Sequence, residues 1–331
     1  MKRLALDEAM FQGAISLERG DGWIRPWRLP FHLLSLFPDP EGIVLRAGQS
    51  AGVRLRLATN SRELGLEVQP FEERRLFDLT VDNELLDTTE LPAGAGELRF
   101  EPLAEGEKVV EVWLPADWQA RPRALLLDDG AWAAPAADDR RRWVAYGSSI
   151  THCRGAHSPA RTWPATAARM RDLHLTSLGF GGQCHLDPMV ALTIRDLPAD
   201  LISIKAGINI YGAASLSPRT FQPALIGFVR IVREGHPNVP IIVVSPIISP
   251  PREAFENAVG YHLAAMRDAV ADSVQRLADL GDEHLHYVDG RELFGPDLVA
   301  EYLPDELHPN GDGYEILGRN FAEKVLTTVD F

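Results

Sequence analysis

The sequence predicts two successive domains of different fold class. An antiparallel β-sandwich is expected over residues 1–135, and an α/β domain with a parallel sheet is expected over residues 136–331. Three observations support this division. Short stretches of alternating apolar and polar residues fill the first part. A small, prolyl and charged segment typical of a linker follows at residues 131–142. Beyond it, wholly apolar stretches alternate with helical patterns.

The expected strands of the first domain are short and closely spaced. Strict alternation is found at residues 53–57, 64–68 and 76–81, and the pattern continues at 98–100, 109–114 and 124–127. Because alternate side chains of a strand point to opposite faces, each stretch has one apolar face, and two sheets can bury these faces against each other. A turn is expected at Asp82-Asn83. The aromatic residues of the early segment are expected in the core or at the domain interface, with a sugar-stacking platform as the alternative: Trp23, Trp27, Phe31 and Phe37.

The second domain is expected to contain buried parallel strands at residues 143–146, 175–180, 201–206, 241–245 and 285–288. Helical patterns lie between them, near residues 221–234, 254–280 and 313–326, and another helix begins where Thr162 can cap a turn that contains Pro164. This alternation predicts a sheet covered by helices on both faces, with function at the carboxyl ends of its strands. Ser149, Gly182 and Asn209 come just after three of these ends.

The candidate catalytic residues are Ser149, Asp305 and His308. A serine hydroxyl is a weak nucleophile until an imidazole takes its proton, and the imidazole needs a carboxylate to orient it and stabilise its cation. Asp305 and His308 are three residues apart, so a single turn can present both. Each half has another interpretation on its own, since a Gly-x-Ser turn also arises by chance and an Asp-x-x-His pair also caps surface turns.

Two glycine-bearing strand ends strengthen the first interpretation. Residues 178–183 and 206–209 both follow apolar stretches, and the second ends in Asn209. At such ends, backbone N–H groups and a side-chain amide can converge on an oxyanion that develops during acyl transfer.

With these motifs in order, the chain resembles the SGNH (GDSL-type) serine hydrolase family from about residue 141 to residue 325. Gly147-Ser148-Ser149 stands where the family has Gly-Asp-Ser, and Gly207-Ile208-Asn209-Ile210 stands where it has Gly-x-Asn-Asp. Gly182 matches the glycine of the second block, and Asp305 to Pro309 completes Asp-x-x-His-Pro. Ser148 and Ile210 depart from the pattern, because each replaces an aspartate.

The resemblance implies a three-layer, flavodoxin-like α/β/α catalytic domain with an acyl-serine mechanism. Ser149 would be the nucleophile, His308 the general base and Asp305 its orienting carboxylate. The backbone N–H of Ser149, with Gly182 and Asn209, would form the oxyanion hole. Three neighbouring residues are weighed as substrate contacts, with loop capping as the alternative: His152, His185 and Tyr211.

A β-sandwich before such a domain resembles one subgroup of this family, which includes carbohydrate esterases and a salicylyltransferase of polyketide biosynthesis. The resemblance implies an O-acyltransferase or esterase that acts on a small molecule. The reaction can include acyl or salicylyl transfer from a CoA thioester to a hydroxyl of a polyketide. The alternatives are a plain carbohydrate O-acetyl esterase and, in another class, a non-catalytic carbohydrate-binding protein. No cofactor is expected, and acyl-CoA is a candidate donor substrate.

Composition narrows the expected partners and location. A net charge of −14 disfavours nucleic acid and anionic membrane surfaces. No stretch approaches 18 apolar residues, and the N-terminal residues do not read as a secretory signal, so a cytoplasmic protein is expected. Cys153 and Cys184 are expected as free thiols, and no Cys or His spacing is typical of a metal site. The number of subunits is left open.

Overall fold

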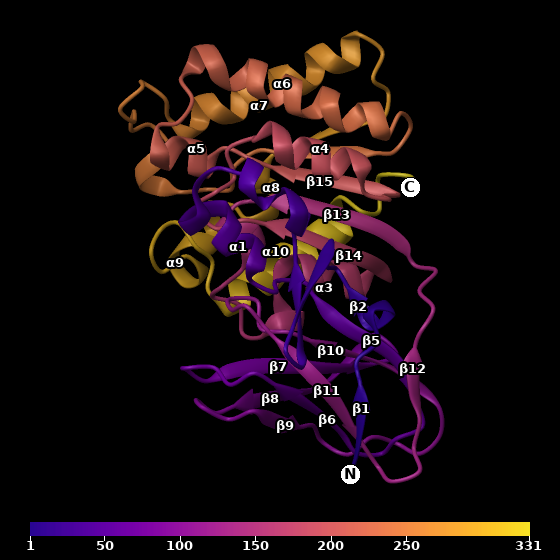
Figure 1. Ribbon diagram of the computed structural model, residues 1–331. Coiled ribbons are helices and arrows are strands. Elements are labelled where there is room, and N and C mark those ends of the chain that lie inside the picture. The colour runs from indigo at the N-terminus through magenta and orange to yellow at the C-terminus, as the bar shows by residue number, and fades with distance from the viewer.

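Figure 1 shows the computed structural model of the chain, which describes residues 1–331 apart from the side chains of residues 39 and 40. The antiparallel strands of the N-terminal part form the lower half of the view, and the parallel sheet with its helices forms the upper half. The two-part fold that the sequence predicts is therefore confirmed, while a domain boundary between residues 135 and 136 stays a prediction. Among the described residues, no helix is long and apolar enough to cross a membrane.

The N-terminal part is built from two antiparallel sheets. One has the order β1 (Lys2–Ala5), β11 (Pro122–Leu127), β6 (Leu64–Val68) and β9 (Glu97–Arg99). The other has the order β12 (Ala133–Pro135), β5 (Arg54–Thr59), β10 (Lys108–Trp113), β7 (Arg75–Val81) and β8 (Glu84–Leu91), and β2 (Phe11–Gln12) also pairs with β5. Apolar side chains from both sheets, such as Leu57, Leu66 and Val112, share one buried cluster.

The turn at Asp82-Asn83 forms as predicted. It joins β7 to β8, and both residues have positive φ, 48° and 72°. Two consecutive residues of this kind form a type I′ turn, whose twist matches that of the strands.

The segment between β2 and β5 leaves the sandwich. It contains the hairpin of β3 (Ser16–Gly20) and β4 (Trp23–Trp27), short helices at Phe31–Leu36 and Asp39–Val44, and α1 (Leu45–Gly48). Trp27, Phe37 and Ala47 belong to the hydrophobic cluster of the parallel sheet rather than to that of the sandwich. In Figure 1 this indigo segment lies against the upper half of the molecule.

The parallel sheet has five strands in the order β14 (Leu173–Gly179), β13 (Arg141–Gly147), β15 (Leu201–Lys205), β16 (Ile241–Val244) and β17 (Leu285–Val288). In chain order this is 2-1-3-4-5, the flavodoxin-like arrangement, and ligands of such sheets bind where the order reverses. Here the reversal lies between β13 and β15. β15 and β16 are buried along their whole length, as expected of strands covered on both faces.

Helices cover both faces of this sheet (Figure 1). On one side lie α4 (Pro188–Asp196), α6 (Pro218–Gly235) and α7 (Leu263–Asp279), and on the other lie α3 (Trp163–Met170) and α10 (Gly311–Lys324). Four short helices join these elements: α2 (Ser149–His152), α5 (Ile208–Ala213), α8 (Gly290–Leu293) and α9 (Val299–Tyr302).

The predicted start of α3 is correct, and the predicted start of α7 is not. The predicted cap at Thr162 is present, since its hydroxyl accepts a hydrogen bond from the Ala165 N–H at 3.3 Å. The helix expected from residue 254 instead begins at Leu263. Asn257 holds a turn by accepting bonds from the N–H groups of Val259 and Tyr261, and His262 then caps the helix.

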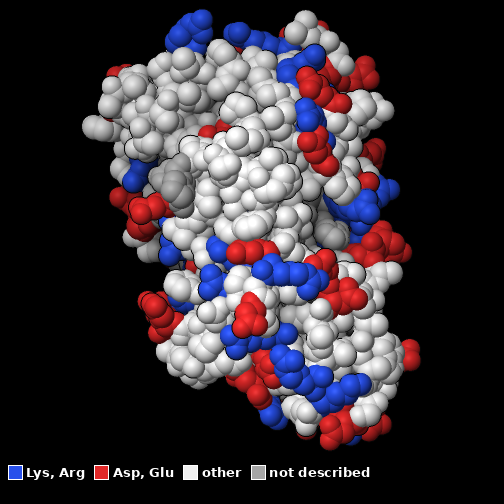
Figure 2. All heavy atoms as spheres, in the orientation of Figure 1, with Lys and Arg blue, Asp and Glu red and all other residues white. Residues whose placement is uncertain are grey.

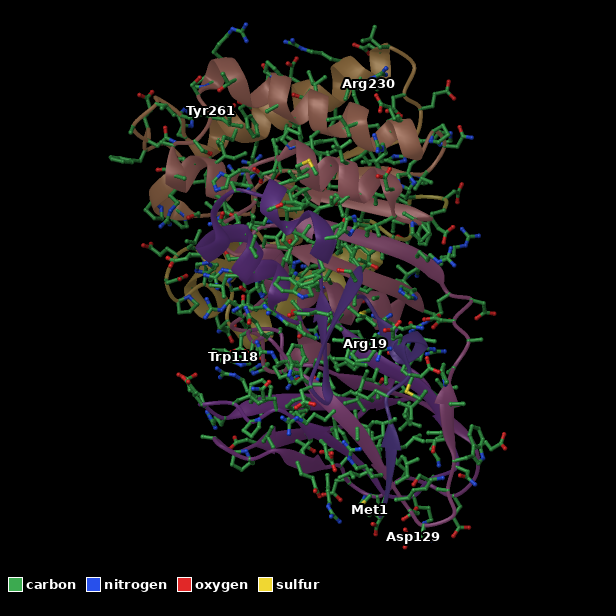
Figure 3. All side chains as sticks on the ribbon, in the orientation of Figure 1. Met1, Arg19, Trp118, Asp129, Arg230 and Tyr261 are labelled. Carbon is green, nitrogen blue, oxygen red and sulfur yellow. The ribbon has the colours of Figure 1, made fainter. Side chains whose placement is uncertain are left out.

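Buried arginines join the two halves along the edge of the sheet formed by β14. Arg28 is fully buried and donates hydrogen bonds to the carbonyls of Ser177 and Gly179. Arg54 donates to the Leu175 carbonyl at 2.9 Å and forms an ion pair with Glu111 at 3.4 Å. Figure 3 shows side chains filling this junction, with Trp118 near it. These bonds hold the N-terminal part in a defined position beside the sheet.

Candidate active site

Ser149 lies at the carboxyl end of β13, as the first residue of α2. Ser148 caps the helix, because its hydroxyl accepts a hydrogen bond from the Ile150 N–H at 3.3 Å. The tight strand-to-helix turn needs glycine at position 147, since a Cβ there would collide with the Thr151 side chain. The N–H of Ser149 is one of the first in the helix and therefore has no acceptor within it.

His308 reaches Ser149 from the loop before α10. Its Nε2 lies 2.9 Å from Ser149 Oγ, and its Nδ1 lies 2.7 Å from Asp305 Oδ2. A carboxylate oxygen can only accept, so Nδ1 carries the proton and Nε2 is left to accept one from the serine. The structure thus joins the three residues in one hydrogen-bonded chain.

Asp305 also shapes the loop that carries His308. Its Oδ1 accepts from the backbone N–H groups of His308, at 2.6 Å, and Leu307, at 3.0 Å, and Glu306 between them has a left-handed backbone with φ 57°. Partial burial raises the pKa of Asp305, but the bonds from His308 and Leu307 outweigh that effect and leave the pKa below its usual value. The carboxylate therefore stays ionised at neutral pH, as an orienting group must.

Asn209 lies in the first turn of α5, which follows β15. Its Oδ1 accepts a hydrogen bond from the Cys184 N–H at 3.1 Å. Because a backbone N–H needs an acceptor, this bond identifies the oxygen of the amide and leaves the NH₂ group as the free donor. Gly182, with φ 76°, and Asn209 line the same cavity as Ser149 and His308.

This cavity has a volume of about 670 Å³. Arg46 of α1 and Asn209 of α5 contribute to its wall, and both helices lie on the left of the view in Figure 1. Besides the four residues above, its wall includes glycines and largely apolar side chains from α5, α10 and nearby loops: Gly155, Gly181, Ile208, Gly212, Ala213, Leu307 and Tyr314. A substrate can therefore reach Ser149 from solvent, and the apolar part of the wall would cover part of the bound substrate.

The three residues weighed as substrate contacts do not line this cavity. His152 is fully buried, with Nε2 bonded to the Ala116 carbonyl at 2.8 Å and Nδ1 accepting from the Gly181 N–H at 3.3 Å. Burial, together with the charge of Arg28, lowers its pKa well below the usual value, so it stays neutral. His152 therefore links the sandwich to the loop that carries Gly182, and a substrate contact by this residue stays a prediction.

His185 and Tyr211 are also engaged elsewhere. His185 bonds the Ser215 hydroxyl at 2.8 Å and the Gly182 carbonyl at 3.1 Å, and the Tyr211 hydroxyl donates to the Phe255 carbonyl at 3.1 Å. Both residues hold the loops that surround the cavity. This matches the alternative of loop capping.

The sequence analysis missed three arginines that do line the cavity: Arg46, Arg154 and Arg252. Arg154 lies in the loop after α2, and Arg252 ends a short helix (Pro250–Arg252) that follows β16, so both come after strand ends where function was expected. Arg46 belongs to α1, in the N-terminal part, and no local pattern connects it to the site.

The two departures from the family pattern have local structural roles. Ser148 caps α2, and Ile210 is fully buried in the core of the α/β part. Cys153 and Cys184 are buried, free thiols, and burial raises the pKa of Cys184 to about 12. Neither cysteine is therefore a reactive thiolate at neutral pH.

Residues 145–316 match the model of the GDSL-like lipase/acylhydrolase family, and residues 9–120 match that of the N-terminal domain of SsfX3. No curated protein matches significantly.

Among solved structures, the chain is similar to the salicylyl-acyltransferase SsfX3 from a tetracycline biosynthetic pathway. The two share 37% identity over 99% of this chain and 98% of that one, with a TM-score of 0.90. A protein from Bacteroides ovatus described as a GDSL-like lipase is 19% identical over 98% and 97% of the chains, with a TM-score of 0.80. A family two carbohydrate esterase from Clostridium thermocellum, in complex with cellohexaose, is 15% identical over 92% and 98%, with a TM-score of 0.68. The last two likenesses show the fold alone.

Proposed function

The chain belongs to the GDSL-like lipase/acylhydrolase family, and we propose that it is an acyltransferase that passes an acyl group from a thioester to a hydroxyl through an ester on Ser149. The observation that carries the proposal is the hydrogen-bonded chain from Ser149 through His308 to Asp305, which opens into the cavity beside Asn209. The resemblance drawn from the sequence is confirmed at the level of the family, and the roles below are proposals.

In the first half of the reaction, Ser149 Oγ attacks the carbonyl carbon of the donor while His308 Nε2 takes the hydroxyl proton. The ionised Asp305 stabilises the imidazolium that forms. The carbonyl oxygen becomes an oxyanion, which the N–H of Ser149, the loop at Gly182 and the amide NH₂ of Asn209 would stabilise. When the intermediate collapses, His308 returns the proton to the leaving thiol, and the acyl group stays on Ser149.

In the second half, a hydroxyl of the acceptor attacks the acyl-serine. His308 takes the proton of that hydroxyl and gives it to Ser149 Oγ as the serine leaves, so the product is an ester and the enzyme is regenerated. Water in place of the acceptor gives hydrolysis by the same steps. The triad is therefore the same for an esterase and a transferase, and the difference lies in what the cavity admits.

Similarity along the whole chain favours transfer. The 37% identity to the salicylyl-acyltransferase extends over both parts of the molecule, whereas the carbohydrate esterase is similar in fold only. On this basis we propose an acyl-CoA as donor, an aromatic acyl group such as salicylyl, and a hydroxyl of a polyketide as acceptor. A non-catalytic carbohydrate-binding role is disfavoured, because such a protein has no use for the linked Ser149, His308 and Asp305. A cytoplasmic location stays a prediction.

The partition of the acyl-enzyme between water and an acceptor tests the proposal. The protein would be incubated with salicylyl-CoA, alone and with hydroxylated aromatic polyketides, and products would be separated by chromatography with mass detection. We expect the ester product to rise with acceptor concentration while the rate of CoA release rises or stays constant. The Ser149→Ala variant is the control for uncatalysed transfer. If every acceptor leaves free salicylate as the sole product, the protein is an esterase and the transferase proposal fails.

Asn209 provides a second test, aimed at the oxyanion. Replacing it by alanine removes one donor directed at charge that exists mainly in the transition state, so kcat should fall about 10² to 10³-fold while KM changes little. Steady-state kinetics with a p-nitrophenyl ester measures both constants. Because Asn209 also accepts the bond from Cys184, circular dichroism and a melting curve must show that the variant is folded. A change confined to KM would mean that Asn209 binds the substrate instead.

A further inference from the structure

No described acidic residue forms an ion pair with the arginines of the cavity wall. Among the described residues, no carboxylate lies within ion-pair distance of Arg46, Arg154 or Arg252, although the chain has 47 acidic residues against 33 basic ones. Two other arginines that are removed from solvent do have such partners, whereas the buried Arg28 is satisfied by backbone carbonyls. Arg140 pairs with Glu111 at 2.5 Å, and Arg267 pairs with Glu253 at 2.5 Å.

This arrangement is electrostatically unfavourable in the absence of a ligand. Burial lowers the pKa of Arg46, and the nearby positive charge of Arg154 lowers it further. Like charges held close together in a partly buried wall repel one another unless an anion lies between them. Acidic and basic side chains are interspersed over the face that Figure 2 shows, whereas no described carboxylate neutralises the three arginines of this wall.

Two of the arginines are held in place by hydrogen bonds. Arg46 lies beside the loop that carries Gly182, and Arg252 lies beside the turn that carries His308. Arg46 donates from Nε to the Gly181 carbonyl at 3.1 Å and from Nη1 to Gln49 Oε1 at 3.3 Å, next to Gly182. Arg252 donates from Nη1 to Ser249 Oγ at 2.9 Å and to the Glu306 carbonyl at 3.3 Å, within the turn between Asp305 and His308. Both therefore keep guanidinium N–H groups that these bonds do not use.

Arg154 extends the charged wall toward a second cavity. It is exposed, and it lines both the cavity of Ser149 and another of about 440 Å³ at the junction with the sandwich. Pro115, Ala116 and Asp117 form part of the wall of that second cavity, close in sequence to Trp118, which Figure 3 labels. An elongated molecule bound at Ser149 can therefore reach Arg154 and continue along the junction.

We propose that Arg46, Arg154 and Arg252 bind an anionic group, a phosphate or a carboxylate, that is carried by the acyl donor. Planar guanidinium groups bind both anions through paired hydrogen bonds. The inference rests on the proposed function, and it adds a substrate class: donors with negative charge near the acyl group or along its carrier are preferred over neutral ones.

Four donors distinguish the two sources of charge. Acetyl-CoA has phosphates and a neutral acyl group, the succinyl thioester of N-acetylcysteamine has a carboxylate and no phosphate, succinyl-CoA has both, and the acetyl thioester of N-acetylcysteamine has neither. The variants are Arg154→Gln and the double variant Arg46→Gln/Arg154→Gln, with Arg230→Gln as the matched control. Arg230 is exposed on α6, which in Figure 3 lies on the side of the parallel sheet away from the sandwich.

In the arginine variants, we expect the ratio of kcat/KM for a charged donor over the neutral donor to fall about tenfold or more, mainly through KM. The control keeps the ratio of the unmodified protein. A fall for acetyl-CoA but not for the succinyl thioester of N-acetylcysteamine assigns the cluster to phosphate, and the reverse result assigns it to a carboxylate. Because Arg154 is exposed and no hydrogen bond ties its side chain to another described residue, its single variant remains informative if the double variant fails to fold.

An unchanged ratio for every charged donor in the Arg154→Gln variant would overturn the inference. Hydrolysis of p-nitrophenyl acetate, a neutral ester, separates this result from a failure of the proposed function. If the unmodified protein cleaves that ester and Ser149→Ala does not, the acyl-serine mechanism stands whatever the arginine variants show. If the unmodified protein forms no acyl-enzyme from any donor, the proposed function itself fails.

Discussion

Replacing Ser149 by alanine is expected to abolish covalent labelling by a fluorophosphonate probe and to lower kcat about 10⁴-fold or more. The reason is geometric as well as chemical. Ser149 Oγ lies 2.9 Å from the imidazole nitrogen that would take its proton, and it opens into the cavity. Intact-mass spectrometry measures the adduct, and steady-state hydrolysis of a p-nitrophenyl ester measures kcat.

The adjacent Ser148 is the matched control for this prediction. Its hydroxyl caps α2, so the Ser148→Ala variant should lose about 1 kcal/mol of stability and keep its labelling. Thermal unfolding measures the first effect and the probe measures the second. Labelling that persists in Ser149→Ala and disappears in Ser148→Ala would transfer the nucleophile to position 148.

Replacing His308 by alanine is expected to lower kcat about as much as the loss of the serine, again about 10⁴-fold or more, because the two residues act as a unit. Asp305→Asn should cost less, since the imidazole can still take the proton without its orienting carboxylate. An amide at position 305 also retains an oxygen that can accept the bonds from the Leu307 and His308 N–H groups, so the loop is expected to survive.

His284→Ala is the matched control for the histidine prediction. His284 is exposed just before β17, at the end of the sheet opposite the cavity, and its replacement should leave kcat unchanged. The rates of all three variants are compared with one p-nitrophenyl ester at one pH. If His308→Ala retained most of its turnover, the general base would have to be another histidine and the proposed mechanism would be wrong.

Much of the fold could be predicted because its signals are local. Alternation in residues 53–57 and 64–68 identified two sandwich strands, since burial on one face of a sheet requires a period of two residues. The capping hydroxyl of Thr162 marked the start of α3, and Asp82-Asn83 marked a turn. The start of α7 was missed, because the turn that delays it depends on side-chain bonds from Asn257 that no periodicity reveals.

Distance along the sequence is a weak guide to which side chains face the cavity. His152, His185 and Tyr211 were weighed as substrate contacts because they follow the motif residues closely in sequence. Closeness in sequence does not determine the direction of a side chain. In the structure, each of the three bonds a backbone carbonyl of the protein instead of lining the cavity.

The sequence by itself determined the family, the two-part fold and the candidate triad, because these are recorded in strand patterns and in short motifs at strand ends and turns. Asp305 and His308 are three residues apart, and a single turn with a left-handed residue at Glu306 presents both. The tertiary structure alone decided which side chains surround them. Arg46 reaches the Gly181 carbonyl across 135 positions of the chain, and Arg28 reaches the Gly179 carbonyl across 151. Contacts over such separations arise from the packing of the N-terminal part against β14, which leaves no periodic trace in the sequence.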